Sequence, residues 1–317
     1  MSVQKDLRSE RNLSHFEKKF QKCRQYKNSH FLAKGTFGAV YFAEDKDGHP
    51  LAVKVAIGSS HKLQKLISRE INFMSSFEHP NIIALLCVDI QHLNCFYTME
   101  FANGGDLKQR FETKKASERC AKHVFKQIVE AVSYLHNKKK VIHHDIKPAN
   151  VLLMSTDQFP VAKLTDFGLS ASIEQTKKHS ALGAKGSYQY KAPEKLKLQL
   201  RVTGDVKHCT EKVDVYAIGI TLFEVSAVTI KPFKSKDKQL AEIESGMLLK
   251  RMIRQLRKKK NKSKEFLSFL SRCLQTEEGN RASAGELVLH PWLAVSYCGD
   301  TASSDSGDSS DSSFIDT

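Results

Sequence analysis

Four polar residues border two short apolar runs, VLLM and VAKL, near the middle of the chain. Asp145, Lys147 and Asn150 come just before the first run, and Asp166 follows the second. The runs are typical of a hairpin of buried strands, which would hold all four side chains in loops at the strand ends. A carboxylate can accept a proton from a hydroxyl, carboxylate and amide oxygens can ligate Mg²⁺, and an ammonium can neutralise a phosphate. These residue types at this spacing therefore predict phosphoryl transfer.

The order of the same residues resembles a known family. Residues 143–150 read H-x-D-x-K-P-x-N and residues 166–168 read D-F-G, a pattern that resembles the catalytic core of eukaryotic protein kinases. The resemblance implies that Asp145 is the catalytic base and that Lys147 neutralises the transferring γ-phosphate of ATP. It also implies that Asn150 and Asp166 bind Mg²⁺. A lysine two residues after the base is characteristic of the serine/threonine class, which implies transfer to Ser and Thr hydroxyls of proteins.

A stretch near the start resembles the nucleotide-binding elements of the same family. Residues 32–40 read LAKGTFGAV, in which glycines would let backbone N–H groups approach phosphate oxygens. The resemblance assigns this loop to ATP, with alanine in place of the first of the three usual glycines: Leu32, Ala33, Lys34, Gly35, Thr36, Phe37, Gly38, Ala39 and Val40. Ala52 and Lys54 stand in AVKV, which resembles the strand whose lysine contacts the α- and β-phosphates. Residues 61–77 have apolar residues at helical spacing. The resemblance implies that a glutamate of this helix pairs with Lys54, and Glu70 is the best placed candidate.

Residues 99–107, MEFANGGDL, resemble the hinge between the two lobes of a kinase. The resemblance implies that the backbone at Glu100 and Ala102 binds the adenine edge, with Met99 at the back of the pocket. Asp106 is expected near the ribose and the substrate path. Leu152, in the first apolar run, is also assigned to the nucleotide site by the resemblance.

The stretch 169–194 resembles an activation segment that closes in A-P-E. Its Glu194 is expected to pair with Arg281, and Ser187 stands where the serine/threonine class keeps a threonine that bonds the base and the lysine. Before Asp145 stands His144, where kinases switched by loop phosphorylation place an arginine. Because histidine is largely neutral near pH 7, a loop phosphate would find no fixed charge at this position. We therefore expect substantial activity without loop phosphorylation. The alternative is that a loop residue is phosphorylated and pairs with nearby lysines, the candidates being Ser172, Thr176 and Ser180 with Lys177, Lys178 and Lys185.

Composition limits the classes of function. The 317 residues carry a net charge of +15, which favours anionic partners such as ATP, acidic protein segments, nucleic acid or anionic lipid. The seven cysteines are scattered, without C-x-x-C pairs, which argues against zinc and for reduced thiols in the cytoplasm or nucleus. The first residues lack the apolar core of a secretory signal, and no uncharged apolar run is long enough for a membrane span. We expect an intracellular protein that does not cross a membrane.

The predicted fold class is α+β, a bilobal protein-kinase-like fold with a small β-rich N-lobe and a larger, mainly helical C-lobe. The expected divisions are a basic extension over 1–25, a kinase domain over 26–293 and a disordered Ser/Asp-rich tail over 294–317. Within the domain, the N-lobe is expected over about 26–99, the hinge over 100–106 and the C-lobe over 107–293. The helix that begins near Asp214 is apolar nearly all round, which is typical of a core, and the resemblance implies that Asp214 caps the catalytic loop.

Two charged stretches remain open to alternatives. Nine lysines and arginines crowd residues 250–264, which predicts a solvated helix face, a docking surface for acidic substrates or a nuclear import signal. Residues 305–310 read D-S-G-D-S-S, the spacing of a phosphodegron read by a ubiquitin-ligase adaptor, or simply an acidic tail. Two other classes compete with the whole interpretation. A pseudokinase scaffold would need damage to the catalytic set, and a nucleic-acid binder would draw only on charge, with no recognisable binding motif. A small-molecule kinase of the same fold is a further alternative, against which the A-P-E region argues.

Overall fold

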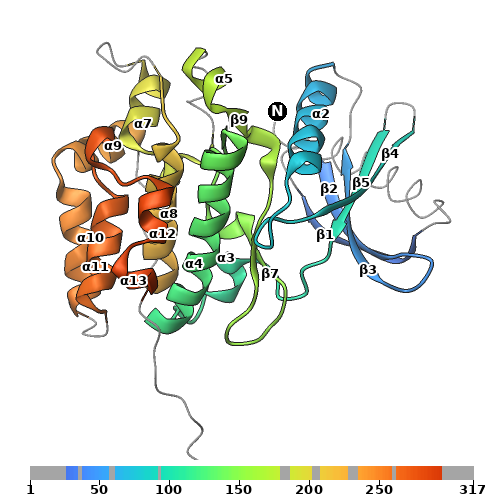
Figure 1. Ribbon diagram of the computed structural model, residues 1–317, viewed down its shortest axis with the longest axis horizontal. Helices are drawn as coiled ribbons and strands as arrows, with labels where there is room; N and C mark the ends of the chain where they lie inside the picture. Colours follow the sequence, from blue (N-terminus) through green and yellow to red (C-terminus); the bar gives the residue numbers. More distant parts are fainter. Residues whose placement is uncertain are drawn as a thin grey trace, which may run out of the picture.

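The computed structural model describes residues 26–34, 38–56, 61–91, 94–178, 186–201, 208–227, 235–258 and 262–294. Figure 1 shows a small lobe, made of one sheet and one helix, beside a larger, mainly helical lobe. This arrangement confirms the predicted bilobal α+β architecture. The expected extension over 1–25, the loop residues Gly35, Thr36 and Phe37, and residues 295–317 lie outside the described residues.

The small lobe contains an antiparallel sheet with the strand order β1-β2-β3-β5-β4. Its strands are β1 (Lys27–Lys34), β2 (Gly38–Glu44), β3 (Pro50–Ala56), β4 (Leu85–Gln91) and β5 (Asn94–Glu100). Side chains alternate along β2, so that Ala39, Tyr41 and Ala43 are buried on one face of the sheet. Val40 and Ala52 lie on the other face and pack toward the main core between the lobes.

Helix α2 (His61–Ser76) packs against β4 and against the 3₁₀ turn Phe167–Leu169 of the large lobe. The largely apolar stretch 82–89 predicts a strand from Ile82 onward, but β4 begins only at Leu85. Ile82 instead forms an isolated parallel bridge with Leu164, and Ile83 N donates to Leu164 O at 3.0 Å. Both isoleucines are buried, so this short segment ties the two lobes together before the chain joins the sheet.

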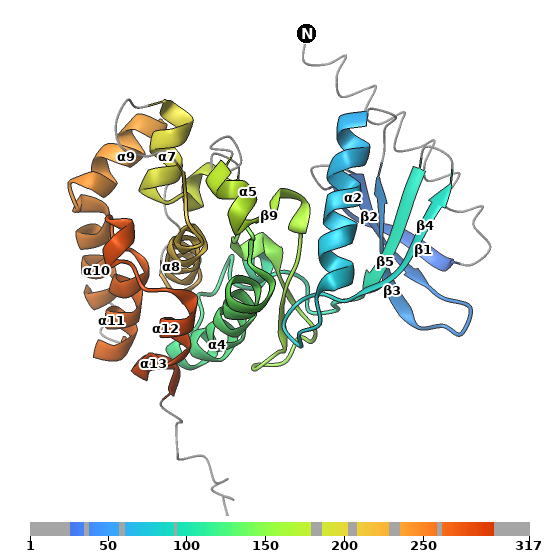
Figure 2. The same ribbon diagram turned by 45° about the horizontal axis from the view of Figure 1, so that its top comes forward.

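The large lobe surrounds helix α8 (Lys212–Ser226), which is buried on nearly every side, as its apolar sequence predicted. Helix α4 (Glu118–Tyr134) packs against α8, α12 and β8 (Ala162–Leu164). Figure 2 shows the remaining helices gathered around these two. They are α3 (Leu107–Arg110), α5 (Ile173–Lys178), α7 (Pro193–Leu200), α9 (Lys236–Glu244), α10 (Met247–Lys258), α11 (Lys264–Cys273), α12 (Ala284–Val288) and α13 (Pro291–Ala294). Within the described ranges, no helix has the length and apolar character that crossing a bilayer requires.

Helix α4 ends earlier than the sequence pattern predicted. The amphipathic pattern of residues 117–137 predicts one helix over that range, but the α-helix stops at Tyr134 and a wider π turn follows over Leu135–Lys139. Lys140 then adopts a left-handed conformation with φ of 56°. The buried His136 explains the change, because its Nε2 lies 2.9 Å from Asp214 Oδ2 and ties the turn to α8.

Two small antiparallel sheets hold the loops that carry the predicted chemistry. Strand β7 (Val151–Leu153) pairs with β8, which confirms the predicted hairpin with each strand one residue shorter than its apolar run. Strand β6 (Val141–Ile142) pairs with β9 (Ala171–Ser172). The loop after β6 and the loop after β8 lie side by side, because Ser170 Oγ donates to His143 O, and the second loop reaches the small lobe, where Asp166 lies 3.5 Å from Lys54.

Candidate active site

A buried lysine joins the sheet, helix α2 and the large lobe. Lys54 Nζ on β3 lies 2.7 Å from Glu70 Oε1 on α2 and 3.5 Å from Asp166 Oδ1 after β8. Burial alone would lower the pKa of the Lys54 ammonium, but the charge of Glu70, with smaller contributions from Tyr97 and Asp166, raises it. Lys54 is therefore a fixed cation where the lobes meet, and the predicted Lys54–Glu70 pair is confirmed.

Asp145 and Lys147 occupy the centre of the loop after β6. Lys147 Nζ lies 2.6 Å from Asp145 Oδ2 and 3.0 Å from Ser187 Oγ, and Ser187 N donates to Asp145 Oδ1 at 2.7 Å. These contacts confirm that Ser187 bonds both residues. Asn150 Nδ2 donates to Asp145 O at 2.8 Å and lies 3.2 Å from Oδ2, which fixes the loop from its far end.

These neighbours set the protonation of Asp145. Burial alone would raise the pKa of this carboxyl, but the hydrogen bond and charge of Lys147, together with the bonds from Ser187, lower it below the ordinary value. The side chain is therefore an ionised carboxylate at neutral pH. It can accept or orient the proton of a hydroxyl that comes within hydrogen-bond distance of it.

Asp214 supports the backbone of this loop, as predicted. Its two carboxylate oxygens accept from His143 N at 2.8 Å and from His144 N at 2.9 Å. Burial would raise the pKa of Asp214, but the bond and charge of His136, followed by the charges of His144 and His143, lower it. The carboxylate stays ionised inside α8, so it can hold two consecutive N–H groups of the loop in place.

The residues after β8 turn sharply toward Lys54. Asp166 adopts a left-handed conformation with φ of 65°, which costs energy for a residue with a side chain and is found most often where the surroundings impose it. The next side chain, Phe167, is fully buried, with its ring centroid 5.0 Å from those of Phe77 and His143. Packing of Phe167 between α2 and the catalytic loop therefore sets the direction in which Asp166 points.

The expected nucleotide residues are distributed over both lobes. Leu32, Ala33 and Lys34 lie on β1, and Gly38, Ala39 and Val40 lie on β2. The side chain of Ala39 is buried on the sheet face away from the main core, so only its backbone could take part in a site between the lobes. Ala52 pairs with Met99 across β3 and β5, and both side chains are buried in the main core.

The hinge segment offers backbone groups beside these side chains. Glu100 N donates to Ala84 O at 3.2 Å, and the Glu100 carboxylate is paired with Lys163 at 2.7 Å. Among the described residues, the backbone of Ala102 has no hydrogen bond, so it is open to a ligand such as the adenine edge. Asp106 caps α3 by accepting from Gln109 N at 2.8 Å, and it forms an isolated bridge with Leu152 on β7.

Two oxygen ligands are available where Mg²⁺ was expected. Because Asn150 directs its Nδ2 toward Asp145, its Oδ1 is left without a hydrogen bond among the described residues. Asp166 Oδ1 accepts from Lys54 Nζ, and among the described residues its Oδ2 likewise has no hydrogen bond. An amide oxygen and a carboxylate oxygen are the hard donors that Mg²⁺ prefers, so the residues fit the ion.

Sequence reasoning did not predict a buried cluster behind the catalytic loop. His144 Nε2 lies 3.2 Å from Thr176 Oγ1 on α5, and Lys195 Nζ on α7 donates to His144 O at 3.0 Å. Lys195 Nζ also lies 3.4 Å from His144 Nδ1, and among the described residues this lysine has no carboxylate within salt-bridge distance. Burial lowers the pKa of Lys195. Thr176 was considered only as a candidate phosphorylation site, but its side chain is fully buried. No local pattern could reveal this cluster, because its members come from three separate elements.

A bidentate ion pair holds the end of the activation segment. Arg281 Nη1 and Nη2 lie 2.6 Å and 3.0 Å from the two oxygens of Glu194, and Arg281 is 1% exposed. This confirms the predicted pair and places helix α7 against the segment before α12.

A family model described as "Protein kinase domain" matches residues 26–293. The chain belongs to the protein kinase family. Among curated relatives, this kinase domain is 32% identical over 272 residues to an Aurora kinase of Schizosaccharomyces pombe, which covers 83% of this chain and 69% of that protein. It is 30% identical over 284 residues to CBL-interacting serine/threonine-protein kinase 5 of Arabidopsis thaliana, covering 86% of this chain and 59% of that protein.

A third relative is the probable serine/threonine-protein kinase mkcD of Dictyostelium discoideum, 29% identical over 276 residues. That match covers 84% of this chain and 40% of the relative. The chain thus spans less than two thirds of several kinases that it matches. The kinase domain is the part that all of them share with this protein.

Proposed function

We propose that the protein is a serine/threonine protein kinase that transfers the γ-phosphate of MgATP to Ser and Thr hydroxyls of proteins. The observation that carries the proposal is the joined set of contacts among Asp145, Lys147 and Ser187, together with the contacts of Lys54 to Glu70 and Asp166. Two of these contacts, Lys147 with Ser187 and Lys54 with Asp166, join residues that are 40 and 112 positions apart in the sequence. A chain that had lost catalysis would have no need to preserve all of them.

In this mechanism, the carboxylate of Asp145 accepts or orients the proton of the substrate hydroxyl, whose oxygen forms the new bond to the γ-phosphorus. The bond from that phosphorus to the β,γ-bridging oxygen breaks, and ADP carries the charge away. Lys147 neutralises the transferring phosphoryl group, and Lys54 holds the α- and β-phosphates. Asn150 and Asp166 would hold Mg²⁺, which when bound neutralises phosphate charge. Positioning and charge neutralisation supply most of the rate in such chemistry.

Two substitutions test the proposal. Lys54→Met and Asp145→Asn should each lower turnover by orders of magnitude in protein that remains folded at the assay temperature. Lys54→Met should also lower the thermal midpoint, because it leaves the buried Glu70 carboxylate without its counter-charge. Lys46→Met is the matched control, because that lysine is exposed in the β2–β3 turn and should leave turnover unchanged. The assay follows labelled γ-phosphate onto a peptide library, with analysis of the phosphorylated residue type. Undiminished turnover in either variant, or phosphotyrosine as the main product, would contradict the assignment.

Protein substrates and partners follow from the same proposal. By resemblance to kinases that bind basic substrates, Glu224 could bind a substrate arginine, but it already accepts a hydrogen bond from Tyr190 OH at 2.6 Å. At position 149, where such kinases place another carboxylate, this chain has alanine. Together with the positive net charge, this favours acidic protein segments as substrates. We place the protein in the cytoplasm or nucleus, in keeping with free thiols at the described cysteines.

A ubiquitin-ligase adaptor is the second partner that we propose, binding the D-S-G-D-S-S stretch after phosphorylation. Ser306→Ala combined with Ser310→Ala should lengthen the half-life of the protein in cells. Ser312→Ala combined with Ser313→Ala is the control, because those serines lie outside the motif. An unchanged half-life would leave an acidic tail without this partner.

A further inference from the structure

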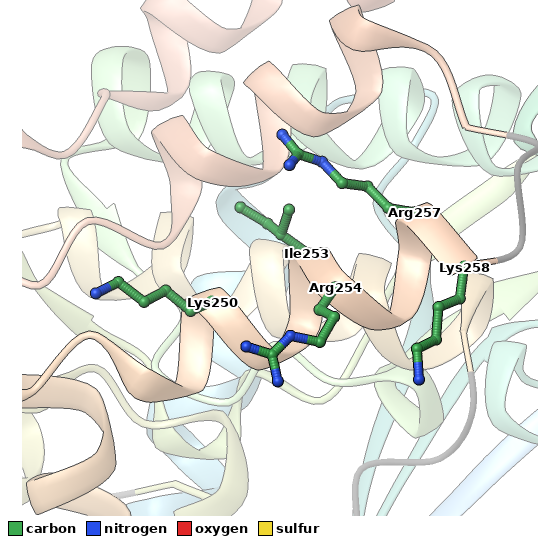
Figure 3. Close-up of a pocket in the computed structure, with 5 residues that line it drawn as sticks. All are labelled: Lys250, Ile253, Arg254, Arg257 and Lys258. Carbon is green, nitrogen blue, oxygen red and sulfur yellow. The ribbon is translucent and has the colours of Figure 1, made fainter.

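Helix α10 has one buried face and one strongly basic face. Its buried side chains are Leu248, Met252 and Leu256, which pack into the large lobe. The exposed side chains include five cations on a helix of twelve residues: Lys250, Arg251, Arg254, Arg257 and Lys258. Figure 3 shows four of them spread around Ile253, where together they line an open hollow of about 570 Å³.

Most of these charges have no counter-charge. Arg251 pairs with Glu242 at 2.9 Å, but among the described residues no carboxylate lies within salt-bridge distance of the other four cations. Lys250 and Arg254 are four residues apart, as are Arg254 and Lys258, and like charges at this spacing on a helix repel one another. The basic face of α10, defined by Lys250, Arg254, Arg257 and Lys258, is therefore suited to an anionic occupant.

The described chain stops beside the start of α11, the helix that follows α10. Glu118 accepts from Ser263 N at 2.8 Å and from Trp292 Nε1 at 3.1 Å, so the start of α11 and helix α13 meet at one carboxylate. Lys258 precedes Ser263 by five residues, which places their Cα atoms within about 19 Å of each other. Figure 1 and Figure 2 both show α10, α11 and α13 gathered at the same part of the large lobe. The chain beyond Ala294 therefore starts beside α11, the helix that follows α10 in the sequence.

The sequence of residues 295–317 complements that face. It contains aspartates at 300, 305, 308, 311 and 316 and no lysine or arginine. Asp300 can extend about 20 Å from Ala294, and later aspartates reach further, whereas a helix of twelve residues is about 18 Å long. Phe314 and Ile315 add apolar side chains that suit Ile253 in the hollow.

We propose that residues 299–317 dock in cis on the basic face of α10. Because the two are joined by a short stretch of chain, the effective concentration of the acidic segment at the face is in the millimolar range or above, so a modest attraction suffices. An acidic partner or nucleic acid in solution must displace it. Phosphorylation of serines in the segment would strengthen the docking by adding negative charge opposite the two arginines. This binding does not depend on the proposed phosphotransfer.

Zero-length carbodiimide crosslinking of the full chain, followed by mass spectrometry, tests the docking directly. The reagent joins a carboxylate to an amine in contact with it. We expect linked peptides that pair 295–317 with Lys250 or Lys258 in the monomer band, independent of protein concentration and suppressed at high salt. The Lys197–Glu244 pair, at 2.8 Å between α7 and α9, serves as the internal positive control.

A matched pair of variants tests the charge of the face while leaving the reporter lysines intact. Arg254→Gln with Arg257→Gln should lower the yield of those linked peptides several-fold. Lys46→Gln with Lys126→Gln removes the same charge from exposed positions elsewhere and should leave the yield unchanged. Three results would overturn the proposal: the control link forming without links to 295–317, links confined to a dimer band, or a yield that the arginine substitutions do not change.

Discussion

Removing Arg281 should destabilise this kinase domain more than most single substitutions. Its guanidinium is fully buried, donates to both oxygens of Glu194, and also donates to Gln275 O and Lys212 O at 3.1 Å. Arg281→Met leaves a buried carboxylate without a counter-charge, which costs about 3–5 kcal/mol when one partner of such a pair is removed. For a domain of this size, that loss lowers the thermal midpoint by about 6–20 °C.

The partner substitution separates the pair from its surroundings. Glu194→Gln should also destabilise, because it leaves the buried Arg281 charge uncompensated. The double variant should be less destabilised than the sum of the two singles by about 1–3 kcal/mol, since neither charge is then stranded. Lys178→Met is the control, because Lys178 and Glu174 pair on the surface with side chains 67% and 77% exposed. Exposed pairs of this kind contribute little.

Urea and thermal unfolding, followed by circular dichroism on the wild type and the four variants, provide the measurement. The free energies should be compared at matched temperature, with ligand absent. If Arg281→Met unfolds within about 1 kcal/mol of the wild type, the buried pair is not the source of stability that its geometry implies. If the double variant loses the full sum of the singles, Glu194 and Arg281 do not act as a unit.

Three further outcomes follow from individual side chains. Phosphatase-treated enzyme should keep most of its activity, because the contact between Thr176 and His144 holds α5 against the catalytic loop without a phosphate. Near-complete loss of activity in folded enzyme would refute this expectation. Burial, reinforced by nearby cations, lowers the pKa of Lys191 from 10.5 to about 8. Between these two pH values the unfolded chain binds more protons than the folded protein, so the stability of the fold rises with pH. The Lys191 side chain therefore destabilises the fold most at the lower end of this range. The stability advantage of Lys191→Met should therefore shrink between pH 7.5 and 10 in thermal unfolding, and a constant difference would contradict the assignment. Gly104→Ala should lower the thermal midpoint by several degrees, because the added Cβ would lie 2.2 Å from Ser155 O. Gly279→Ala is the control, because a Cβ there would have no atom within 4 Å and should leave the midpoint unchanged. Equal midpoints for the two variants would contradict the close approach at Gly104.

The kinase interpretation depended on residues whose relation is local in the sequence. Asp145, Lys147 and Asn150 lie within six positions, so any fold that places their loop at a strand end brings them together. Lys54 and Glu70 are separated by one strand end and part of a helix, and their pairing could also be predicted. Because these separations are short, residue types and spacing were enough to indicate phosphoryl transfer, and the resemblance to protein kinases assigned each residue its role.

Other features were decided only by tertiary structure. His144, Thr176 and Lys195 meet from three elements, and neither the threonine nor the lysine belongs to a pattern that marks it as a neighbour of the catalytic loop. The end of α4 and the start of β4 differed from prediction because contacts with Asp214 and Leu164 overrode apolar spacing.

Helix α10 shows the same division between sequence and structure. Its basic composition is plain in the chain, and three interpretations of it stood open. Only the fold reveals which cations lack a counter-charge, and only the shared contacts of Glu118 bring Ser263 beside Trp292. Sequence specifies the residue types and their local order, whereas burial and long-range packing decide which charges are neutralised, because electrostatic energy depends on distance in space.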